Sequence, residues 1–202
     1  MDGPKGPAIT LLNLKEVSVT SEFDYIYSTQ ELVKQKSSVL KEIIGQKLLA
    51  SYVVWDIEED EWFKDGVVVF EFEKLQLELC CNKMEELSVK FNSINLLKKP
   101  HIYWDADGAY EWRKNAISEV NKVVGNKLEK LRIVEAEFCS WPSSESYGTP
   151  NMVCTWILNG INFYFSNGYF AFFNALDENG ITNEVERDAT LREIDLDGTI
   201  EI

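Results

Sequence analysis

Apolar residues recur at helical spacing in two stretches of the chain, and a glycine follows each stretch. The first contains Leu40, Ile43 and Ile44, and the second contains Ile117, Val120, Val123 and Val124. Gly45 and Gly125 come directly after these faces. Because glycine adopts the left-handed conformation that ends many helices, each glycine marks a helix end. The pattern predicts helices at about 30–44 and 110–124.

The segments that follow the predicted helices alternate between apolar and polar residues, as expected of half-buried strands. In GVVVFEFEK, residues 66–74, phenylalanines alternate with glutamates. Later in the chain, MVCTWIL, INFYF and YFAFF have the composition of three strands, separated by Asn159-Gly160 and Asn167-Gly168. Asn-Gly is the strongest short signal for a β-hairpin. We therefore predict an antiparallel meander of three or four strands after each helix.

An internal repeat links the two parts of the chain. The stretch 39–55, VLKEIIGQKLLASYVVW, resembles 119–135, EVNKVVGNKLEKLRIVE, with an offset of 80 residues that superimposes their glycines. The strands that follow, 69–82 and 162–174, also resemble each other, with a one-residue difference at the turn. Each half therefore repeats one plan, a helix followed by an antiparallel meander.

These elements predict an α+β protein made of two similar helix-plus-antiparallel-meander halves, with the helices packed on antiparallel sheet. The first half would occupy residues 1–98, with strands extending to about 82. The second would occupy residues 99–202, with strands extending to about 176 and an acidic tail. The segment that joins them is short and aromatic, so we expect the halves to pack as one unit.

Composition places the chain among globular proteins. Of its 202 residues 45% are hydrophobic, which provides an adequate core. The sequence shows no run of about 18 apolar residues and no secretory pattern at its start, so we expect a cytoplasmic protein with no membrane span. Cys80, Cys81, Cys139 and Cys154 lack Cys-x-x-Cys spacing and there is a single histidine, so we expect reduced thiols and no zinc site.

One catalytic motif occurs in the sequence, but its surroundings do not fit it. DLDGT, residues 195–199, is the nucleophile signature of haloacid dehalogenase-like phosphatases. That family needs a long chain after the motif to supply its other ligands, whereas three residues follow Thr199 here. We predict instead an Asp-Gly turn that joins Ile194 and Ile200 in a small hairpin. WDADG, residues 104–108, lacks the ligand spacing of a calcium-binding loop, and we predict no catalytic residue, no metal site and no cofactor.

The chain has a net charge of −14, and its negative charge is concentrated in two segments. Residues 56–65 carry six acids and one lysine, and residues 181–202 carry seven acids and two arginines, so each segment contributes −5. Such a chain repels the phosphates of nucleic acid, so we expect no nucleic-acid partner. The charge favours a basic protein partner instead.

Candidate partner-binding residues cluster in YVVWDIEEDEWF, residues 52–63. They are Trp55, Asp56, Glu58, Glu59, Asp60, Glu61 and Trp62, joined by Asp177 and Glu178 in the later acidic region. Aromatic rings can anchor a partner while neighbouring carboxylates steer a basic one towards the surface. The alternative is an exposed hairpin tip whose aromatic residues point into the core, and the sequence leaves both interpretations open.

The stretch FYFSNGYFAFFNALDENGIT, residues 163–182, resembles strand–turn–strand endings in the acidic immunity proteins encoded beside bacterial polymorphic toxins. The piece NALDENG and the order of helix, VVGNKL, strand and glycine-turn meander are similar too. The resemblance implies a non-enzymatic cytoplasmic protein that binds and blocks a cognate toxin, with basic nucleases among the expected targets. It transfers no functional residue. Two alternatives stay open, a scaffold module that forms a homodimer and an enzyme of unrecognised type.

Overall fold

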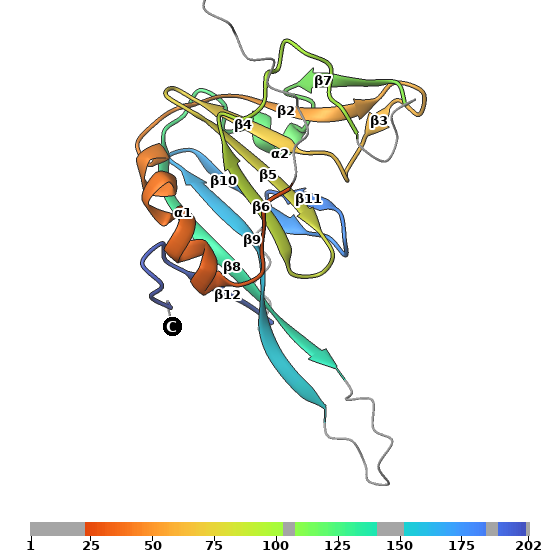
Figure 1. Cartoon of the computed structure of the whole chain (residues 1–202). Helices are drawn as coiled ribbons and strands as arrows, with labels where there is room; N and C mark the ends of the chain where they lie inside the picture. The colour runs from red at the N-terminus through yellow and green to blue at the C-terminus, as the bar shows by residue number, and fades with distance from the viewer. Residues whose placement is uncertain (1–22, 103–107, 141–151, 185–189, 201–202) are drawn as a thin grey trace, which may run out of the picture.

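The computed structural model describes residues 23–102, 108–140, 152–184 and 190–200, which form two antiparallel sheets packed face to face (Figure 1). The first sheet has the strand order β1-β6-β5-β4-β2-β3, and β7 also pairs with β2. Strand β7 pairs with one edge of β2, and the other edge of β2 pairs with both β3 and β4. The strands are β1 (Tyr25–Ile26), β2 (Leu48–Asp56), β3 (Glu61–Trp62), β4 (Val68–Phe72), β5 (Gln76–Asn82), β6 (Glu86–Phe91) and β7 (Tyr110–Lys114).

The second sheet has the strand order β11-β10-β9-β8-β12. Its strands are β8 (Leu128–Ser140), β9 (Val153–Phe165), β10 (Gly168–Asn174), β11 (Asn179–Thr182) and β12 (Leu191–Ile194). The described residues contain two helices, α1 (Thr29–Ile43) and the single turn α2 (Ser118–Asn121). Within the described ranges, neither helix has the length and apolar character needed to cross a membrane.

The predicted α+β fold, with helices packed on antiparallel sheet, is wrong. The inner faces of the two sheets cover each other, and their aromatic residues meet in one core. The ring centroid of Phe70 on β4 lies 5.4 Å from that of Phe163 and 5.2 Å from that of Phe170, both on the second sheet. Because each sheet provides the apolar cover for the other, helices do not form a layer, and α1 packs at one side, along β8 (Figure 1).

Helix α1 confirms the prediction of a helix at about 30–44. Its residues Leu32, Leu40 and Ile43 are buried in the core between the sheets. Gly45 follows with a φ of 87°, the left-handed conformation expected of it, and Gly125 has a φ of 85°.

The helix predicted at about 110–124 is wrong over most of its length. Residues Tyr110–Lys114 form β7, which pairs with the free edge of β2. Tyr110 and Trp112 pack against Val54 of that strand in a small second cluster. The apolar spacing supports only α2, whose Val120 enters the main core. Most of the WDADG segment lies outside the described residues.

Two of the predicted turns are confirmed. The turn that contains Asn167 joins β9 to β10, and β10 begins at Gly168. At the end of the described chain, Ile194 and Ile200 form an antiparallel bridge around the Asp-Gly turn.

The hairpin predicted at Asn159-Gly160 is wrong, because β9 runs through both residues. The register against β8 shifts here, since Val134 pairs with Gly160 while the next residue of β8 pairs with Leu158. Asn159 is therefore the extra residue of a β-bulge. Glycine follows because a Cβ atom at position 160 would lie 2.1 Å from the carbonyl oxygen of Phe172.

The strand pairing of the two sheets follows the internal repeat. Leu48 pairs with Phe72 in the first sheet, and Leu128, which is 80 residues later, pairs with Phe165 in the second. A register shift follows directly after each pair, after Leu48 on β2 and after Leu128 on β8. The two sheets therefore show the same register shift at the starts of β2 and β8.

The two glycine turns also bind each other. Gly45 N donates to Leu128 O, and Gly125 N donates to Leu48 O, each with an N···O distance of 2.7 Å. This reciprocal pair of backbone hydrogen bonds joins the starts of β2 and β8.

The expectation of reduced thiols is wrong for one pair of cysteines. Cys139 and Cys154 lie opposite each other on β8 and β9 and form a disulfide in the arm that projects from the sheets (Figure 1). Their separation along the chain does not show this proximity, which comes from strand pairing. Disulfides persist mainly in oxidising compartments, so this pair does not favour the expected cytoplasmic location. Cys80 and Cys81 are free and buried.

Candidate functional site

The predicted acidic segment forms the turn between β2 and β3. Asp56 Oδ1 accepts hydrogen bonds from the backbone N–H groups of Glu58 (2.8 Å) and Glu59 (3.1 Å). Asp60 takes the left-handed conformation, with a φ of 52°. Asp56 therefore orders the turn, as aspartate does in many tight turns, and its carboxylate is used within the fold.

A second group of side chains fixes the base of this hairpin. Asp60 Oδ1 accepts hydrogen bonds from Trp55 Nε1 and from Arg113 Nη1, each with a donor–acceptor distance of 3.0 Å. The Arg113 guanidinium lies 3.9 Å from the centroid of a Trp55 ring and also pairs with Glu111. The hydrogen bond from Trp55, followed by the contacts of Arg113, lowers the pKa of Asp60. The carboxylate of Asp60 is therefore compensated inside the protein.

The other carboxylates of the turn face solvent. Glu58, Glu59 and Glu61 are exposed, and their side chains form no hydrogen bond or ion pair with a residue that the structure describes. Trp55 and Trp62 are partly buried and pack against the core, as the hairpin-tip alternative expects. Three carboxylates without a partner among the described residues therefore lie on a hairpin whose base is fixed.

Asp177 and Glu178 lie in a different turn, between β10 and β11. Asp177 has a φ of 78°. Glu178 forms an ion pair with Lys64, with an Nζ–Oε1 distance of 2.8 Å. Burial, followed by the nearby charge of Glu178, raises the pKa of Asp65. The structure brings Glu178 to the end of the segment 56–65, where Lys64 compensates its charge.

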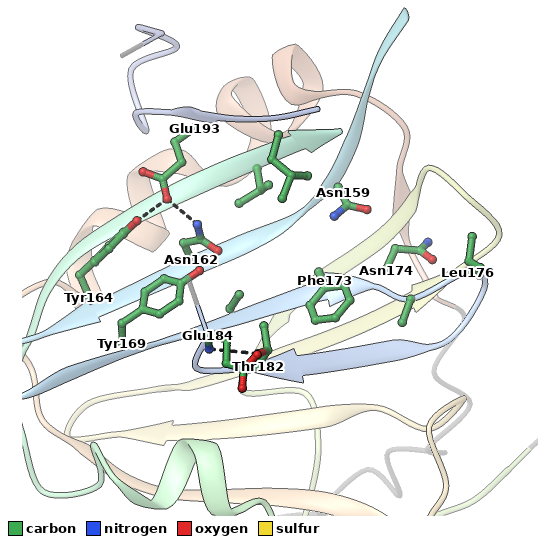
Figure 2. Close-up of a pocket in the computed structure, with 14 residues that line it drawn as sticks. Asn159, Asn162, Tyr164, Tyr169, Phe173, Asn174, Leu176, Thr182, Glu184 and Glu193 are labelled. Atoms are coloured by element: carbon green, nitrogen blue, oxygen red, sulfur yellow. Dashed lines mark hydrogen bonds between the residues drawn. The ribbon is translucent and has the colours of Figure 1, made fainter. Parts of the chain in front are cut away.

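A cavity that the sequence did not reveal lies on the outer face of the second sheet (Figure 2). Its volume is about 520 Å³, and all five strands of that sheet contribute to its lining. Phe173 and Leu176 lie at one end, while Asn162, Tyr164 and Glu193 lie at the other. The described lining residues include no lysine, arginine or histidine.

Glu193 lies at the polar end of this cavity, held by two neighbours. Tyr164 Oη and Asn162 Nδ2 both donate hydrogen bonds to its Oε1 atom (Figure 2). Burial, followed by the hydrogen bond to Glu193, raises the pKa of Tyr164 well above its usual value, so the hydroxyl remains a donor. The Oε2 atom makes no hydrogen bond with any residue in the described ranges. The centroids of the Tyr164 and Tyr169 rings lie 5.0 Å apart.

The cavity could not be recognised in the sequence because strand pairing assembles it. One signal was available, since the outward positions Asn162, Tyr164 and Tyr169 carry amide and aromatic groups where a solvated face usually carries charges. Glu193 gives no such signal, because it is one of seven acids in residues 181–202.

Comparison of the chain with protein-family models, with curated proteins and with solved structures gave no match. The resemblance to immunity proteins therefore stays a prediction, and the geometry described above carries the functional argument.

Proposed function

We propose that this protein is a non-enzymatic binding protein that neutralises a basic protein toxin by covering its active site with the β2–β3 hairpin. The observation that carries the proposal is the position of Glu58, Glu59 and Glu61, which are exposed and uncompensated by any described residue. Like charges on one turn repel each other, so they do not stabilise the fold, whereas a cationic partner would be attracted to them.

The fixed base of the hairpin supports a binding role. Asp60, Trp55 and Arg113 hold the turn in one conformation, so less conformational entropy is lost when a partner binds. The net charge of −14 would accelerate the approach of a basic partner. In contact with a basic nuclease, the carboxylates would take the place of substrate phosphates. The resemblance of residues 163–182 to immunity proteins supports a toxin as the partner.

The test uses the product of the open reading frame beside the gene of this chain. That product is expressed in cells with and without the full chain, and growth is measured. The affinity of the purified pair is then measured for the wild type and for the combined variant Glu58→Lys, Glu59→Lys and Glu61→Lys. We expect the chain to restore growth, and the variant to bind more weakly by about 2 kcal/mol or more, about 30-fold.

A matched control separates a contact from general electrostatics. Glu42, Glu85 and Glu129 are also exposed and uncompensated by described residues, so changing all three to lysine alters the net charge equally. We expect this control to bind within a few-fold of the wild type. Equal weakening in both variants, or unchanged affinity after charge reversal at the hairpin, would remove the hairpin from the interface. A neighbouring product that is not toxic, or whose toxicity the chain does not suppress, would contradict the function itself.

A further inference from the structure

We infer that the cavity on the outer face of the second sheet binds an organic cation in which a guanidinium or primary amine is joined to an apolar body. The cavity and the acidic hairpin belong to different sheets, so this inference does not depend on the proposed toxin binding. It rests on the charge at one end of the cavity, the apolar groups at the other, and the contrast with the same face of the first sheet.

The charge at the polar end comes from Glu193, whose Oε2 atom makes no hydrogen bond with a described residue. A second carboxylate, that of the exposed Glu184, also lines the cavity, next to Thr182 (Figure 2). Among the described residues, the two neighbouring arginines pair with other carboxylates. Arg192 points to the opposite face of β12, where it pairs with Glu135, and Arg132 lies 2.9 Å from Asp195. An ammonium or guanidinium group would therefore meet a carboxylate that Tyr164 and Asn162 already hold in place. The same charge disfavours an anion, because no described lining residue is basic.

The remainder of the cavity suits the apolar body of such a ligand. Tyr164, whose hydroxyl binds the carboxylate, and Tyr169 line the same end of the cavity, and aromatic rings can stack on a cation. Phe173 and Leu176 provide apolar surface at the far end. A volume of about 520 Å³ lies within the range of pockets that hold small ligands, about 300–1,000 Å³.

The same face of the first sheet is filled to a much greater extent, with a hollow of about 40 Å³ beside Val54 against about 520 Å³ in the second sheet. By the register of the repeat, Val54 of β2 corresponds to Val134 of β8. Val54 is covered by Ile102 and Tyr110. Glu78 of β5 is buried and accepts hydrogen bonds from the segment after β6, which covers part of the face. In the second sheet the equivalent face is hollow, and Val134 lines the cavity.

Three probes with one apolar body and different head groups test the inference on the full chain. They are 4-phenylbutylamine, 4-phenylbutanol and 4-phenylbutyrate, titrated while the amide signals of the protein are followed by NMR. We expect saturable binding of the amine, binding of the alcohol that is at least about tenfold weaker, and no binding of the acid. The shifted signals should belong to β9, β10 and β12.

A fourth probe identifies the source of the cation. It is a short peptide, blocked at both ends, with one arginine between apolar residues. Tighter binding of the peptide than of the amine assigns the site to an arginine side chain of a partner protein, and the reverse assigns it to a free amine. Either result supports the shared chemistry.

Two substitutions locate the binding. Glu193→Gln keeps the shape of the side chain and removes its charge, so we expect the affinity for the amine to fall about tenfold while that for the alcohol stays the same. Leu191 lies on the same face, two residues from Glu193, so Leu191→Lys places a built-in ammonium beside the carboxylate and should abolish amine binding. Leu191→Met should bind as the wild type does, and so should Glu58→Gln in the acidic hairpin.

Three results would overturn the inference. They are equal affinity for the amine, the alcohol and the acid, unchanged amine binding in both Glu193→Gln and Leu191→Lys, and no saturable binding of either cationic probe up to about 5 mM, the range of the weakest specific complexes. Because the Leu191→Lys site is only half-buried on an edge strand, this variant remains informative if Glu193→Gln does not fold.

Discussion

Gly160 on β9 pairs with Phe173 on β10, and the absence of a side chain at position 160 permits the close approach of the two backbones. A Cβ atom there would lie 2.1 Å from Phe172 O and 2.7 Å from Phe173 Cα, both atoms of the neighbouring backbone. Since paired strands cannot move apart without losing hydrogen bonds, we expect Gly160→Ala to lower the free energy of unfolding by about 3 kcal/mol. Urea unfolding followed by circular dichroism measures the loss.

Gly198→Ala is the matched control for this prediction. A Cβ atom at position 198 would meet nothing within 4 Å, but its φ of 89° is unfavourable for alanine. The expected cost is therefore conformational, about 1 kcal/mol. If Gly160→Ala lowered the free energy of unfolding no more than Gly198→Ala does, the steric explanation for glycine at position 160 would be wrong.

Two buried thiols should make the stability of the protein fall at alkaline pH. Burial raises the pKa of Cys80 from its ordinary value of 9.0 to about 12, and it raises the pKa of Cys81 well above 9.0. A thiol whose pKa is higher in the folded state favours folding fully below pH 9.0, and this contribution is lost as the pH rises towards about 12. Each thiol accounts for a slope of up to about 1.4 kcal/mol per pH unit.

The double variant Cys80→Ala and Cys81→Ala checks this dependence. It removes packing at every pH, so its free energy of unfolding is lower throughout, but we expect a shallower decline between pH 9 and pH 11, by about 1–2 kcal/mol per pH unit. Urea unfolding at half-unit steps of pH gives both slopes. Parallel curves for the wild type and the variant would show that other groups cause the alkaline loss.

At the scale of elements, Asn179 attaches β11 to the first sheet. Its Oδ1 atom accepts a hydrogen bond from Cys81 N, and its Nδ2 group donates to the carbonyl oxygens of Lys64 and Gly66. The donor–acceptor distance is 2.6 Å in all three hydrogen bonds. The side chain is fully buried. Asn179→Asp would replace the double donor by a buried charge that faces two carbonyl groups. We expect it to lower the free energy of unfolding by about 3 kcal/mol or more.

Asn167→Asp tests whether burial is the cause. Asn167 is exposed, and its Nδ2 group donates one hydrogen bond, to Lys122 O. The same substitution there should cost less than about 1 kcal/mol, because water can replace the lost bond. A similar loss of stability at both positions, measured by urea unfolding, would contradict a special role for Asn179 between the sheets.

Elements set by local signals could be predicted from the sequence, and elements set by a partner strand could not. Helix α1 has its own apolar face and its own end signal at Gly45, and the turn at Asn167 is marked in the sequence by an Asn-Gly pair. In contrast, β7 forms because β2 has a free edge, which residues 110–114 do not reveal. At Gly160 the dipeptide signal of a turn is overruled by pairing on both sides of β9.

The candidate sites divide in the same way. The acidic turn is continuous along the chain, so the charge pattern is sufficient to find it. The contact that fixes this turn could not be found from the charge pattern, because Arg113 binds Asp60 across 53 residues of sequence. The cavity is harder still, since Glu193 meets Tyr164 and Asn162 only after β12 and β9 have both paired with β8.

At the scale of the whole molecule, the two sheets depend on each other. Phe70 is buried against rings of the second sheet, and the reciprocal hydrogen bonds of Gly45 and Gly125 join the starts of β2 and β8. A sheet with one bare apolar face is not stable in water, and each half alone is small. The repeat therefore describes similar geometry in two sheets that share one core.

We expect that neither half folds when it is produced alone. The fragments 1–98 and 99–202 follow the boundary predicted from the sequence, and each should lack the near-ultraviolet circular dichroism of packed aromatic rings. Mixed in equal amounts, they should regain it, because the interface between the sheets supplies most of the core. In the full chain, tryptophan fluorescence and far-ultraviolet circular dichroism should report one coincident urea transition. A fragment with a cooperative transition of its own, or two separate transitions in the full chain, would show that the halves are independent domains and that the shared core contributes little to their stability.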